Sequence, residues 1–363
     1  MKKRFLDILR FTFFLSIGIF FIWLFLRNLT SPEKKEIIHA LKIANYTWIV
    51  IAIVLGLFSH WARAMRWRIL LEPMGFKPRK LNVFMAVMIG YLANLALPRL
   101  GEVSKCGILT QYEKIPFNKS FGTVITERAV DLLAFICLFF LMIFTMSSEL
   151  SMYVNQKIYE PLKLKLSISA PIESNLIWSV VGIITVFIIV FLFLRKKLIT
   201  TKAYLKFNNL LLGFVQGIQS LGRIKHPLGF VFYTIIIWVL YLLMAYIVFF
   251  SLKETASLSI EAGLAVLVFG SIGIMIVQGG IGIYPAIVAE TLFLFSITST
   301  TGYAMGWLIW SSQTIMILFA GVFSLLLLNT FNSKGNGNSG SNKKEDSNIS
   351  GLAKSPDSMA SKS

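Results

Sequence analysis

Long apolar runs recur along the whole chain and are separated by short polar stretches. Several of them approach or exceed the roughly 18–20 residues that an α-helix needs to cross a bilayer. The runs occupy residues 9–26, 46–61, 81–97, 129–146, 176–194, 228–250, 262–277, 284–297 and 303–328. This pattern predicts an all-α fold, a polytopic helical membrane protein with about 7–8 transmembrane segments.

The composition agrees with a membrane protein. Of the 363 residues, 56% are hydrophobic and only 14% are charged, whereas soluble domains carry about 25% charged residues. The net charge of +18 is compatible with nucleic-acid binding, but lysine and arginine also collect in membrane-protein loops as orientation signals. We therefore expect no nucleic-acid partner. Cys106 and Cys137 show neither a disulfide pattern nor metal-ligand spacing, so no metal or other cofactor is expected.

The two ends of the chain are polar around an apolar middle. The first apolar run follows Met-Lys-Lys-Arg, as in a signal peptide, but it is too long for one and no small-residue cleavage site follows it. We expect it to remain as a helix. Residues 331–363 are rich in glycine, serine, asparagine and lysine and have few apolar residues to pack. The prediction is a transmembrane domain at 1–330 and a disordered cytoplasmic tail at 331–363.

Basic residues indicate the orientation in the membrane. They form three clusters, at 2–10, 63–80 and 195–225. The positive-inside rule places all three in the cytoplasm, with Lys77 and Arg195 inside and Lys34 and Lys163 outside. Both termini would then be cytoplasmic in a multi-pass protein of the bacterial cell (inner) membrane. Within the third cluster, apolar residues of 201–225 recur at helical spacing, which predicts an amphipathic surface helix or a helical extension packed against the bundle.

The parity of the crossings points to an interrupted segment. Residues 81–128 have to begin and end in the cytoplasm, although they contain one clearly apolar run. Either the weakly apolar stretch 103–126 crosses the membrane, or the segment enters and turns back. Its midpoint, NLALPRLGE at 94–102, has a helix-breaking proline and a glycine that permits a turn. A re-entrant hairpin is the better fit, because non-helical backbone at membrane depth must be covered by protein or line a watery cavity.

A second interruption lies in the other half of the chain. The sequence QGGIGIYP at 278–285 divides residues 262–297 into two short helices, which would begin and end outside. Two interrupted hairpins that enter from opposite faces indicate an inverted-repeat transporter with a site near the midplane. The two halves show no visible sequence similarity, so the symmetry is a hypothesis.

Ionisable residues at membrane depth are costly and usually face a cavity or a partner. Arg99, Glu102 and Lys105 are spaced by three, so a helix that begins after Pro98 would place them on one face. Beside a broken helix, whose free backbone groups can bind an anion, we interpret them as the lining of a polar cavity. Glu290 stands in an apolar segment; it either faces the same cavity or lies near the membrane interface.

Two further charged groups leave alternatives. Glu127 and Asp131 share a helical face, and Arg128 can pair with a carboxylate. They either pair with Arg99 or Arg128 in a cavity or form a charge cluster at the start of a surface helix, where acidic residues are favourable. The arginines that follow the second apolar run are interpreted as snorkelling to the cytoplasmic face for orientation: Arg63, Arg66 and Arg68.

Four motifs in this order resemble the lysylphosphatidylglycerol synthase transmembrane-region family of flippase-like membrane domains. They are HWARAMRWRILL (60–71), NLALPRLGEVSK (94–105), TERAVDLL (126–133) and GGIG (279–282), and the resemblance runs over about residues 5–330. Lys105 stands where the family usually has arginine. Gln278 precedes the glycines where proline is usual, and Pro285 lies near the position of the family's glutamate.

The resemblance implies a stand-alone lipid translocator, since no soluble aminoacyl-transferase domain accompanies the motifs. The leading hypothesis is a transporter, not an enzyme, for an amphiphile with an anionic headgroup, such as a phospholipid or a polyprenyl-phosphate lipid. Its expected partners are the membrane lipid and a lipid-modifying enzyme. Expected substrate-binding residues are Asn94, Arg99, Glu102, Lys105, Glu127, Arg128, Asp131, Gly279, Gly280, Gly282, Tyr284 and Glu290.

Two alternatives remain open: a membrane-embedded enzyme that modifies lipid headgroups, or an accessory subunit of such an enzyme. Against the enzyme, the sequence has no DxD pair, no HxxxxD pair and no phosphate loop of the GxxxxGK[ST] type. His39, His60 and His226 are scattered and lack metal-ligand spacing.

Overall fold

The computed structural model describes residues 30–97, 99–146 and 224–349, together with Trp23, Arg27 and Gly222. Along the last helix, side chains are described as far as Asn332. Most of the helices expected at 9–26, 176–194 and 201–225 lie outside the described residues, as do Pro98, Arg195 and Lys163. Throughout the described ranges the elements are α-helices and short 3₁₀ turns, without a strand.

The described helices fall into two groups of the chain. The first comprises α2 (Ser31–Ile43), α3 (Tyr46–Leu71), α4 (Lys80–Ala96), α5 (Leu100–Glu113) and α6 (Phe117–Thr145). The second comprises α11 (Pro227–Val248), α12 (Ile260–Ile276), α13 (Ile283–Phe293) and α14 (Ser299–Ile349). Short 3₁₀ turns follow α3 (Glu72–Met74), α11 (Phe249–Ser251) and α12 (Gln278–Gly280).

Four segments are long and apolar enough to cross a bilayer within the described part of the chain. They are Tyr46–Met74, Phe117–Thr145, Pro227–Ser251 and Ser299–Asn332. Three shorter helices are also apolar: Lys80–Leu95, Ile260–Ile276 and Ile283–Phe293. The prediction of an all-α polytopic membrane protein is confirmed.

The two groups share one order of elements: a long helix, two short helices, and a second long helix. The first long helices, α3 and α11, lie side by side and run antiparallel. Near one end the backbone N–H of Asn45 donates to the carbonyl of Ser251 at 2.8 Å; near the other, Arg66 donates to Thr234. The second group is therefore inverted relative to the first.

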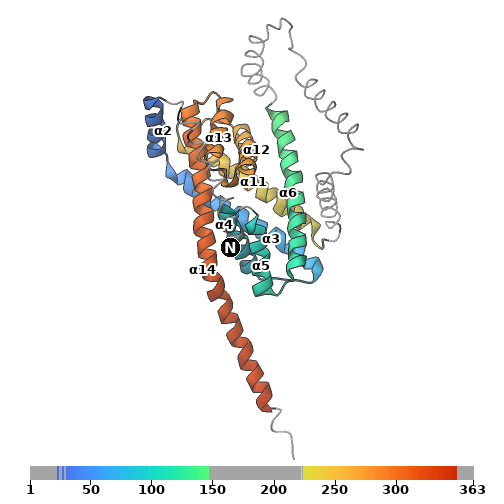
Figure 1. The fold of residues 1–363 in the computed structure, drawn as a ribbon. Coiled ribbons are helices and arrows are strands. Elements are labelled where there is room, and N and C mark those ends of the chain that lie inside the picture. Colours follow the sequence, from blue (N-terminus) through green and yellow to red (C-terminus); the bar gives the residue numbers. More distant parts are fainter. Residues whose placement is uncertain are drawn as a thin grey trace, which may run out of the picture.

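Each pair of short helices is an antiparallel hairpin. In the α4–α5 pair, Asn82 bonds to Glu113, and the backbones come close at Gly90 and Gly101. In the α12–α13 pair, the ring of Tyr284 lies against Gly270. The α12–α13 hairpin lies in the upper part of the bundle in Figure 1 and the α4–α5 hairpin in the lower part.

The last long helix of each group packs against the hairpin of the other group. Helix α6 contacts α12, and α14 contacts α4; Gly321 of α14 lies against Leu92, and Asn332 exchanges hydrogen bonds with Asn82. Helices α6 and α14 therefore flank the hairpins on opposite sides (Figure 1). This reciprocal packing is the arrangement that an inverted repeat produces, although the two sequences do not resemble each other.

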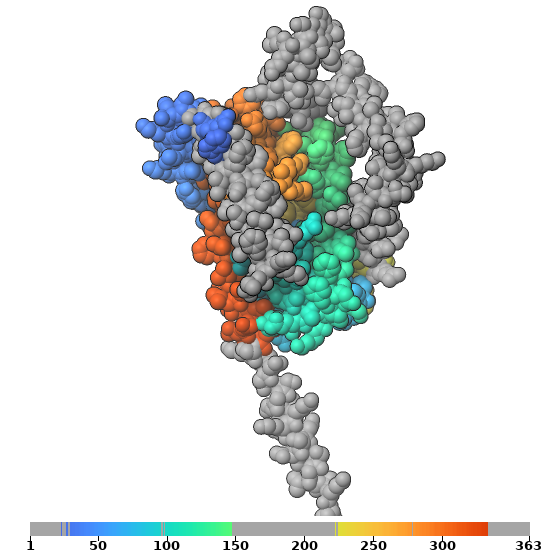
Figure 2. Space-filling view, in the orientation of Figure 1, coloured from blue at the N-terminus to red at the C-terminus, as the bar shows by residue number. Residues whose placement is uncertain are grey.

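Several helices begin or end away from the apolar runs that predicted them. Helix α6 begins at Phe117 rather than at 129, and α3 continues to Leu71 rather than ending at 61, because polar residues inside the bundle find partners there. In Figure 2, α5 and the start of α6 form the lower surface beside α14.

Helix α14 extends to Ile349. The predicted domain boundary at 330 and the predicted disordered tail at 331–363 stay predictions.

Helix α2 was not expected from the apolar pattern. It begins with a capping box, in which Thr30 accepts from the amide of Glu33 and the Glu33 carboxylate accepts from Thr30. These hydrogen bonds lower the pKa of the exposed Glu33 carboxyl. The apolar side of α2 packs on the upper bundle, where Ile37 clusters with Ala289 and Tyr303. Helix α2, which carries Lys34, precedes α3, and the loop around Lys77 follows α3. Lys34 and this loop therefore lie at opposite ends of α3.

Candidate functional site

The break between α4 and α5 is closed by Asn94. The side-chain oxygen of Asn94 accepts a hydrogen bond from the backbone N–H of Gly101 at 2.8 Å, which satisfies a donor that the first turn of a helix leaves free. The residue at the N-cap position, Arg99, has φ of 65° and its side chain is exposed. A left-handed arginine cannot cap the helix, and Asn94 does so from the preceding helix.

Gly101 lets the two helices of this hairpin approach closely. A Cβ atom at Gly101 would lie 2.1 Å from the carbonyl oxygen of Gly90 and 2.6 Å from the Asn94 amide. Since real contacts of this kind do not occur, any larger residue would push α5 away from α4. The close packing fixes where the following residues, Glu102 and Lys105, project.

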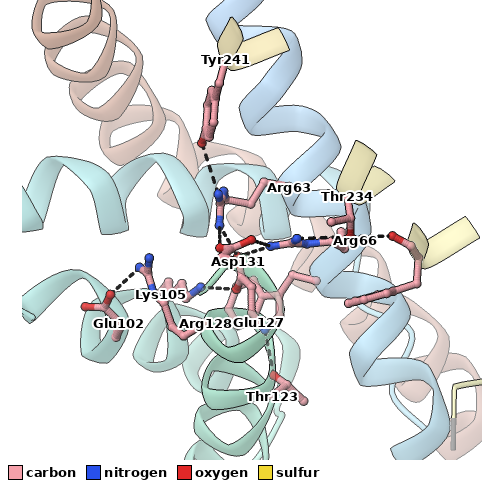
Figure 3. A network of polar contacts seen from close by, with 12 residues as sticks. Arg63, Arg66, Glu102, Lys105, Thr123, Glu127, Arg128, Asp131, Thr234 and Tyr241 are labelled. Atoms are coloured by element: carbon pink, nitrogen blue, oxygen red, sulfur yellow. Dashed lines mark hydrogen bonds and ion pairs between the residues drawn. The ribbon is translucent and has the colours of Figure 1, made fainter. Parts of the chain in front are cut away.

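Glu127 lies at the centre of a buried charge network (Figure 3). One carboxylate oxygen accepts from Arg63 at 2.9 Å and lies 3.5 Å from Arg66; the other accepts from Lys105 at 2.7 Å. The Glu127 side chain is 1% exposed. Helices α3, α5 and α6 meet at this carboxylate, so the network joins three segments that are far apart in sequence.

Asp131, one turn further along α6, extends the network to α11. It accepts from Arg63 at 2.6 Å and from Arg66 at 2.7 Å. The same two arginines donate to Tyr241 and to Thr234, both at 3.3 Å. Asp131 thereby aligns two guanidinium groups between α6 and α11, as Figure 3 shows.

The interpretation of Arg63 and Arg66 as snorkelling residues is wrong. Both are buried, with side chains 6% and 0% exposed, and both pair with carboxylates. They are spaced by three on α3 and face two carboxylates spaced by four on α6, which is a match between helical faces. Arg68 points elsewhere and donates to the carbonyl of Pro78 at 3.1 Å.

The alternative of a helix-start cluster at Glu127, Arg128 and Asp131 is also wrong. Helix α6 begins at Phe117, so these residues lie well inside it. The expected pairing of Glu127 and Asp131 with Arg99 or Arg128 is not observed either. Their partners are Arg63, Arg66 and Lys105.

Arg128 pairs instead with Glu102 of α5. Its side chain is 50% exposed, in contrast to the buried arginines. The whole cluster joins four cations, Arg63, Arg66, Lys105 and Arg128, to three carboxylates, Glu102, Glu127 and Asp131. One positive charge is in excess, and Arg128 is the member best placed to offer it to a ligand.

A cavity of about 330 Å³ opens beside Arg128 between the two groups of helices. Tyr91 and Asn94 of the first hairpin line it, as does Gly279 at the break of the second. A narrow cleft lined by Tyr91, Asn94 and Arg128 leads from this cavity to Glu102 and Glu127. The tips of both hairpins thus meet at one cavity, and the charge network forms its wall on the α6 side.

The break of the second hairpin consists of glycines in a left-handed conformation. Gly279, Gly280 and Gly282 have φ values of 70°, 68° and 74°, which other residues adopt only with strain. The carbonyl of Gly279 accepts from the indole of Trp310 at 2.6 Å. Tyr284 is buried beyond the break and lines the cavity. The turn therefore presents backbone and aromatic groups, without a charged side chain, to the cavity.

Five of the twelve expected site residues line neither the cavity nor the cleft: Arg99, Asp131, Gly280, Gly282 and Glu290. Glu290 is exposed on α13, and Arg99 is exposed at the start of α5. His60, the first residue of the motif at 60–71, also lines the cavity, together with residues that carried no signal in the sequence: Tyr91, Tyr241, Trp310, Gln313 and Thr314. Isolated polar and aromatic residues in apolar helices can be assigned to a site only when the packing shows that they lie together.

Comparison with known families supports the motifs. The family model described as the lysylphosphatidylglycerol synthase TM region matches residues 11–321. The chain belongs to this family. The match includes both hairpins and all members of the charge network, so the geometry described above is that of a lysylphosphatidylglycerol synthase TM region.

A curated relative also matches part of the chain. The "UPF0104 membrane protein MJ1595" of Methanocaldococcus jannaschii is 27% identical over 104 residues, which is 28% of this chain and 31% of that protein. The matched part thus spans less than a third of the relative's length. No solved structure matches the chain.

Proposed function

We propose that this protein is a flippase-like translocator, not an enzyme, of an amphiphile with an anionic headgroup, such as a phospholipid or a polyprenyl-phosphate lipid. The carrying observation is the half-exposed Arg128 on the wall of the cavity, backed by a buried network with one positive charge in excess. A phosphate beside Arg128 would compensate that charge. An arginine suits this role because its planar group can bind two phosphate oxygens together.

The hairpins give the cavity its place in the membrane in this proposal. They enter the bundle from opposite ends, and Tyr91, Asn94 and Gly279 bring both to the cavity. Interrupted, inverted hairpins with a site at their interface are typical of secondary transporters. In the membrane, the two pairs would be re-entrant segments whose tips meet near the midplane, and rocking of one group against the other would expose the cavity alternately.

The distribution of basic residues supports the orientation. The connection between α3 and α4 carries Lys77 and Arg79; Lys119, at the start of α6, lies over the ring of Phe76 in this connection. Lysine and arginine near helix ends favour the cytoplasm. The polar contacts of Asn332 with Asn82 place the end of the membrane-length part of α14 at the same side. We propose a multi-pass protein of the bacterial cell membrane with cytoplasmic termini.

A lipid-modifying enzyme is the protein partner that we propose. The matched family is named as the transmembrane region of a lipid synthase, so a separate enzyme that makes the lipid could supply the substrate. The translocator itself would then act without cofactors.

The test is reconstitution of the purified protein into liposomes with fluorescent short-chain lipids. The protein should move phosphatidylglycerol across the bilayer faster than phosphatidylcholine, which carries no net charge, while protein-free liposomes move neither. Equal rates for both lipids would contradict a preference for anionic headgroups. The absence of movement for phospholipids and for a short polyprenyl phosphate would favour the enzyme or accessory-subunit alternative.

A further inference from the structure

The charge network presents a cation, and not a carboxylate, to the cavity. Arg128 is the one charged side chain among the described residues that line the cavity. The carboxylates of Glu102 and Glu127 open onto the adjoining cleft, where Arg128, Arg63 and Lys105 already bind them. A cationic group in the cavity would meet Arg128, since no carboxylate lines the cavity itself; the Glu102 Oε2 atom, which has no hydrogen-bond partner among the described residues, is buried in the cleft.

Neutral hydrogen-bonding groups on α14 and α3 also line the cavity. Gln313 and Thr314 of α14 line the cavity, and no described residue hydrogen-bonds to either side chain. His60 of α3 is 3% exposed, and its Nδ1 atom has no partner among the described residues. Amides and hydroxyls both donate and accept, so these side chains match a ligand whose groups also do both, such as the hydroxyls of a polyol or sugar.

An aromatic surface completes the cavity. The indole N–H of Trp310 is held by the Gly279 carbonyl at 2.6 Å, and Trp307 packs edge-on with its ring centroid 5.3 Å away. Both contacts fix the orientation of the Trp310 ring beside the cavity. A fixed aromatic ring offers an apolar surface at little entropic cost, which suits the C–H face of a polyol or sugar.

The size of the cavity sets what part of a lipid it can hold. Its volume of about 330 Å³ is near the lower end of the range of small-molecule sites, roughly 300–1,000 Å³. This is room for a headgroup and not for acyl or polyprenyl chains. Ile274, which lines the cavity, is 41% exposed, so an apolar exit for the chains adjoins the site.

We infer that the cavity selects a headgroup in which one phosphate is joined to a neutral, hydroxyl-rich group, and that it discriminates against headgroups carrying an ammonium. The phosphate lies at Arg128, and the hydroxyls face Gln313, Thr314 and His60. This selectivity rests on the proposed function for its role in transport, but the binding preference can be measured by itself. Glycerolipids and polyprenyl lipids both present this headgroup chemistry.

The experiment measures binding of short-chain lipids to the purified full-length protein in detergent, followed by tryptophan fluorescence. Four probes share a phosphodiester: dihexanoyl phosphatidylinositol, phosphatidylmethanol and phosphatidylethanolamine, and farnesyl phosphoryl glucose. Phosphatidylinositol should bind about tenfold more tightly than phosphatidylmethanol, the difference made by one or two hydrogen bonds, and phosphatidylethanolamine should bind most weakly. Tighter binding of the glucose lipid or of phosphatidylinositol identifies the polyprenyl or the glycerolipid class as the source.

A double variant tests the assigned residues. Gln313→Leu with Thr314→Val should reduce the affinity for phosphatidylinositol to that for phosphatidylmethanol and leave the latter unchanged, whereas Gln111→Leu on the exposed face of α5 should change neither. Phosphatidylethanolamine binding as tightly as phosphatidylinositol, or an unaltered preference in the folded double variant, would overturn the inference. If the preference holds but liposomes show no lipid movement, the proposed function fails and the selectivity of the site stands.

Discussion

The two inverted groups of helices share a plan and differ in chemistry. In α3–α6 the hairpin is tied to its neighbours by charges, with Glu127 and Asp131 joining α3, α5 and α6 through Arg63, Arg66 and Lys105. In α11–α14 the hairpin is held by glycines and aromatic rings, such as Gly279 and Trp310. Both devices keep an interrupted helix pair in place, but Arg128, the one charged side chain among the described residues that line the cavity, belongs to the first group.

The difference shows how one scaffold can serve two purposes. A buried charge network is expensive unless every member is paired, so it belongs where a charged ligand must be attracted. A wall of neutral groups attracts no ion and can distinguish headgroups by shape and hydrogen bonding. In the proposed function, the cavity between the two groups combines an anchoring wall, formed by Arg128, with a selecting wall, formed by Gln313, Thr314 and Trp310.

The largest effect is expected when the charged group of helices loses its central carboxylate. Glu127→Gln leaves Arg63 and Arg66 with Asp131 as their carboxylate partner and takes away the carboxylate that pairs with Lys105, and breaking a buried pair in this way costs about 3–5 kcal/mol. Thermal unfolding in detergent should show a large loss of stability. The exposed Glu254→Gln serves as the control. A second substitution, Lys105→Gln, should recover part of the loss; equal stability of Glu127→Gln and the control would contradict the network.

The next effect tests how closely the first hairpin is packed. Gly101→Ala places a methyl group against the Gly90 carbonyl, and overpacking of this kind costs typically about 1–3 kcal/mol. Gly107→Ala on the same helix meets nothing within 4 Å and should be neutral or slightly stabilising, because alanine favours helix more than glycine does. Equal melting temperatures for the two variants would show that the helices are further apart than described.

The second hairpin should respond through backbone strain rather than through packing. At Gly279, φ is 70° and a Cβ atom would meet no neighbour within 4 Å, so Gly279→Ala should cost about 1–2 kcal/mol from the left-handed conformation alone. Gly122→Ala, at an open helical position of α6, is the matched control. A larger loss than that of Gly101→Ala would reverse the expected order of the two hairpins.

The smallest effect concerns Arg99, which the sequence placed among the expected substrate-binding residues. Its exposed side chain lines neither cavity nor cleft, and its φ is 65°. Arg99→Gly removes the strain of the left-handed conformation and should stabilise by up to about 1 kcal/mol, with lipid movement unchanged. Loss of lipid movement in a stable Arg99→Gly variant would return Arg99 to the site.

The sequence predicted the helical class and both interruptions because apolar length and helix-breaking residues are local signals. It also identified Glu102, Lys105, Glu127, Arg128 and Asp131 as members of a polar site. Their partners could not be assigned, because pairing depends on which helical faces meet. Arg63 and Arg66 follow an apolar run and resemble orientation signals until α6 is placed beside α3.

The neutral side of the cavity, lined by Gln313, Thr314 and Trp310, could not be predicted from the sequence for a different reason. Single residues such as Gln313, Thr314 and Trp310 occur in many transmembrane helices, and nothing in their spacing distinguishes a cavity lining from ordinary packing. The packing of α14 against the hairpin tips brings all three residues to the same cavity. Sequence motifs therefore marked the charged side of the cavity, whereas its neutral side became visible only in the packing.

Arg128 offers the most direct test of anion recognition at the junction of the two walls. Its ion pair with Glu102 is half exposed and is worth about 1 kcal/mol or less, so Arg128→Gln should fold nearly as well as the wild type. In liposomes, it should lower the rate of phosphatidylglycerol movement at least about tenfold, the effect of losing one charge-assisted contact. Arg68→Gln, outside the cavity, should match the wild type. Equal phosphatidylglycerol rates for Arg128→Gln and Arg68→Gln would contradict an anion site at this cavity.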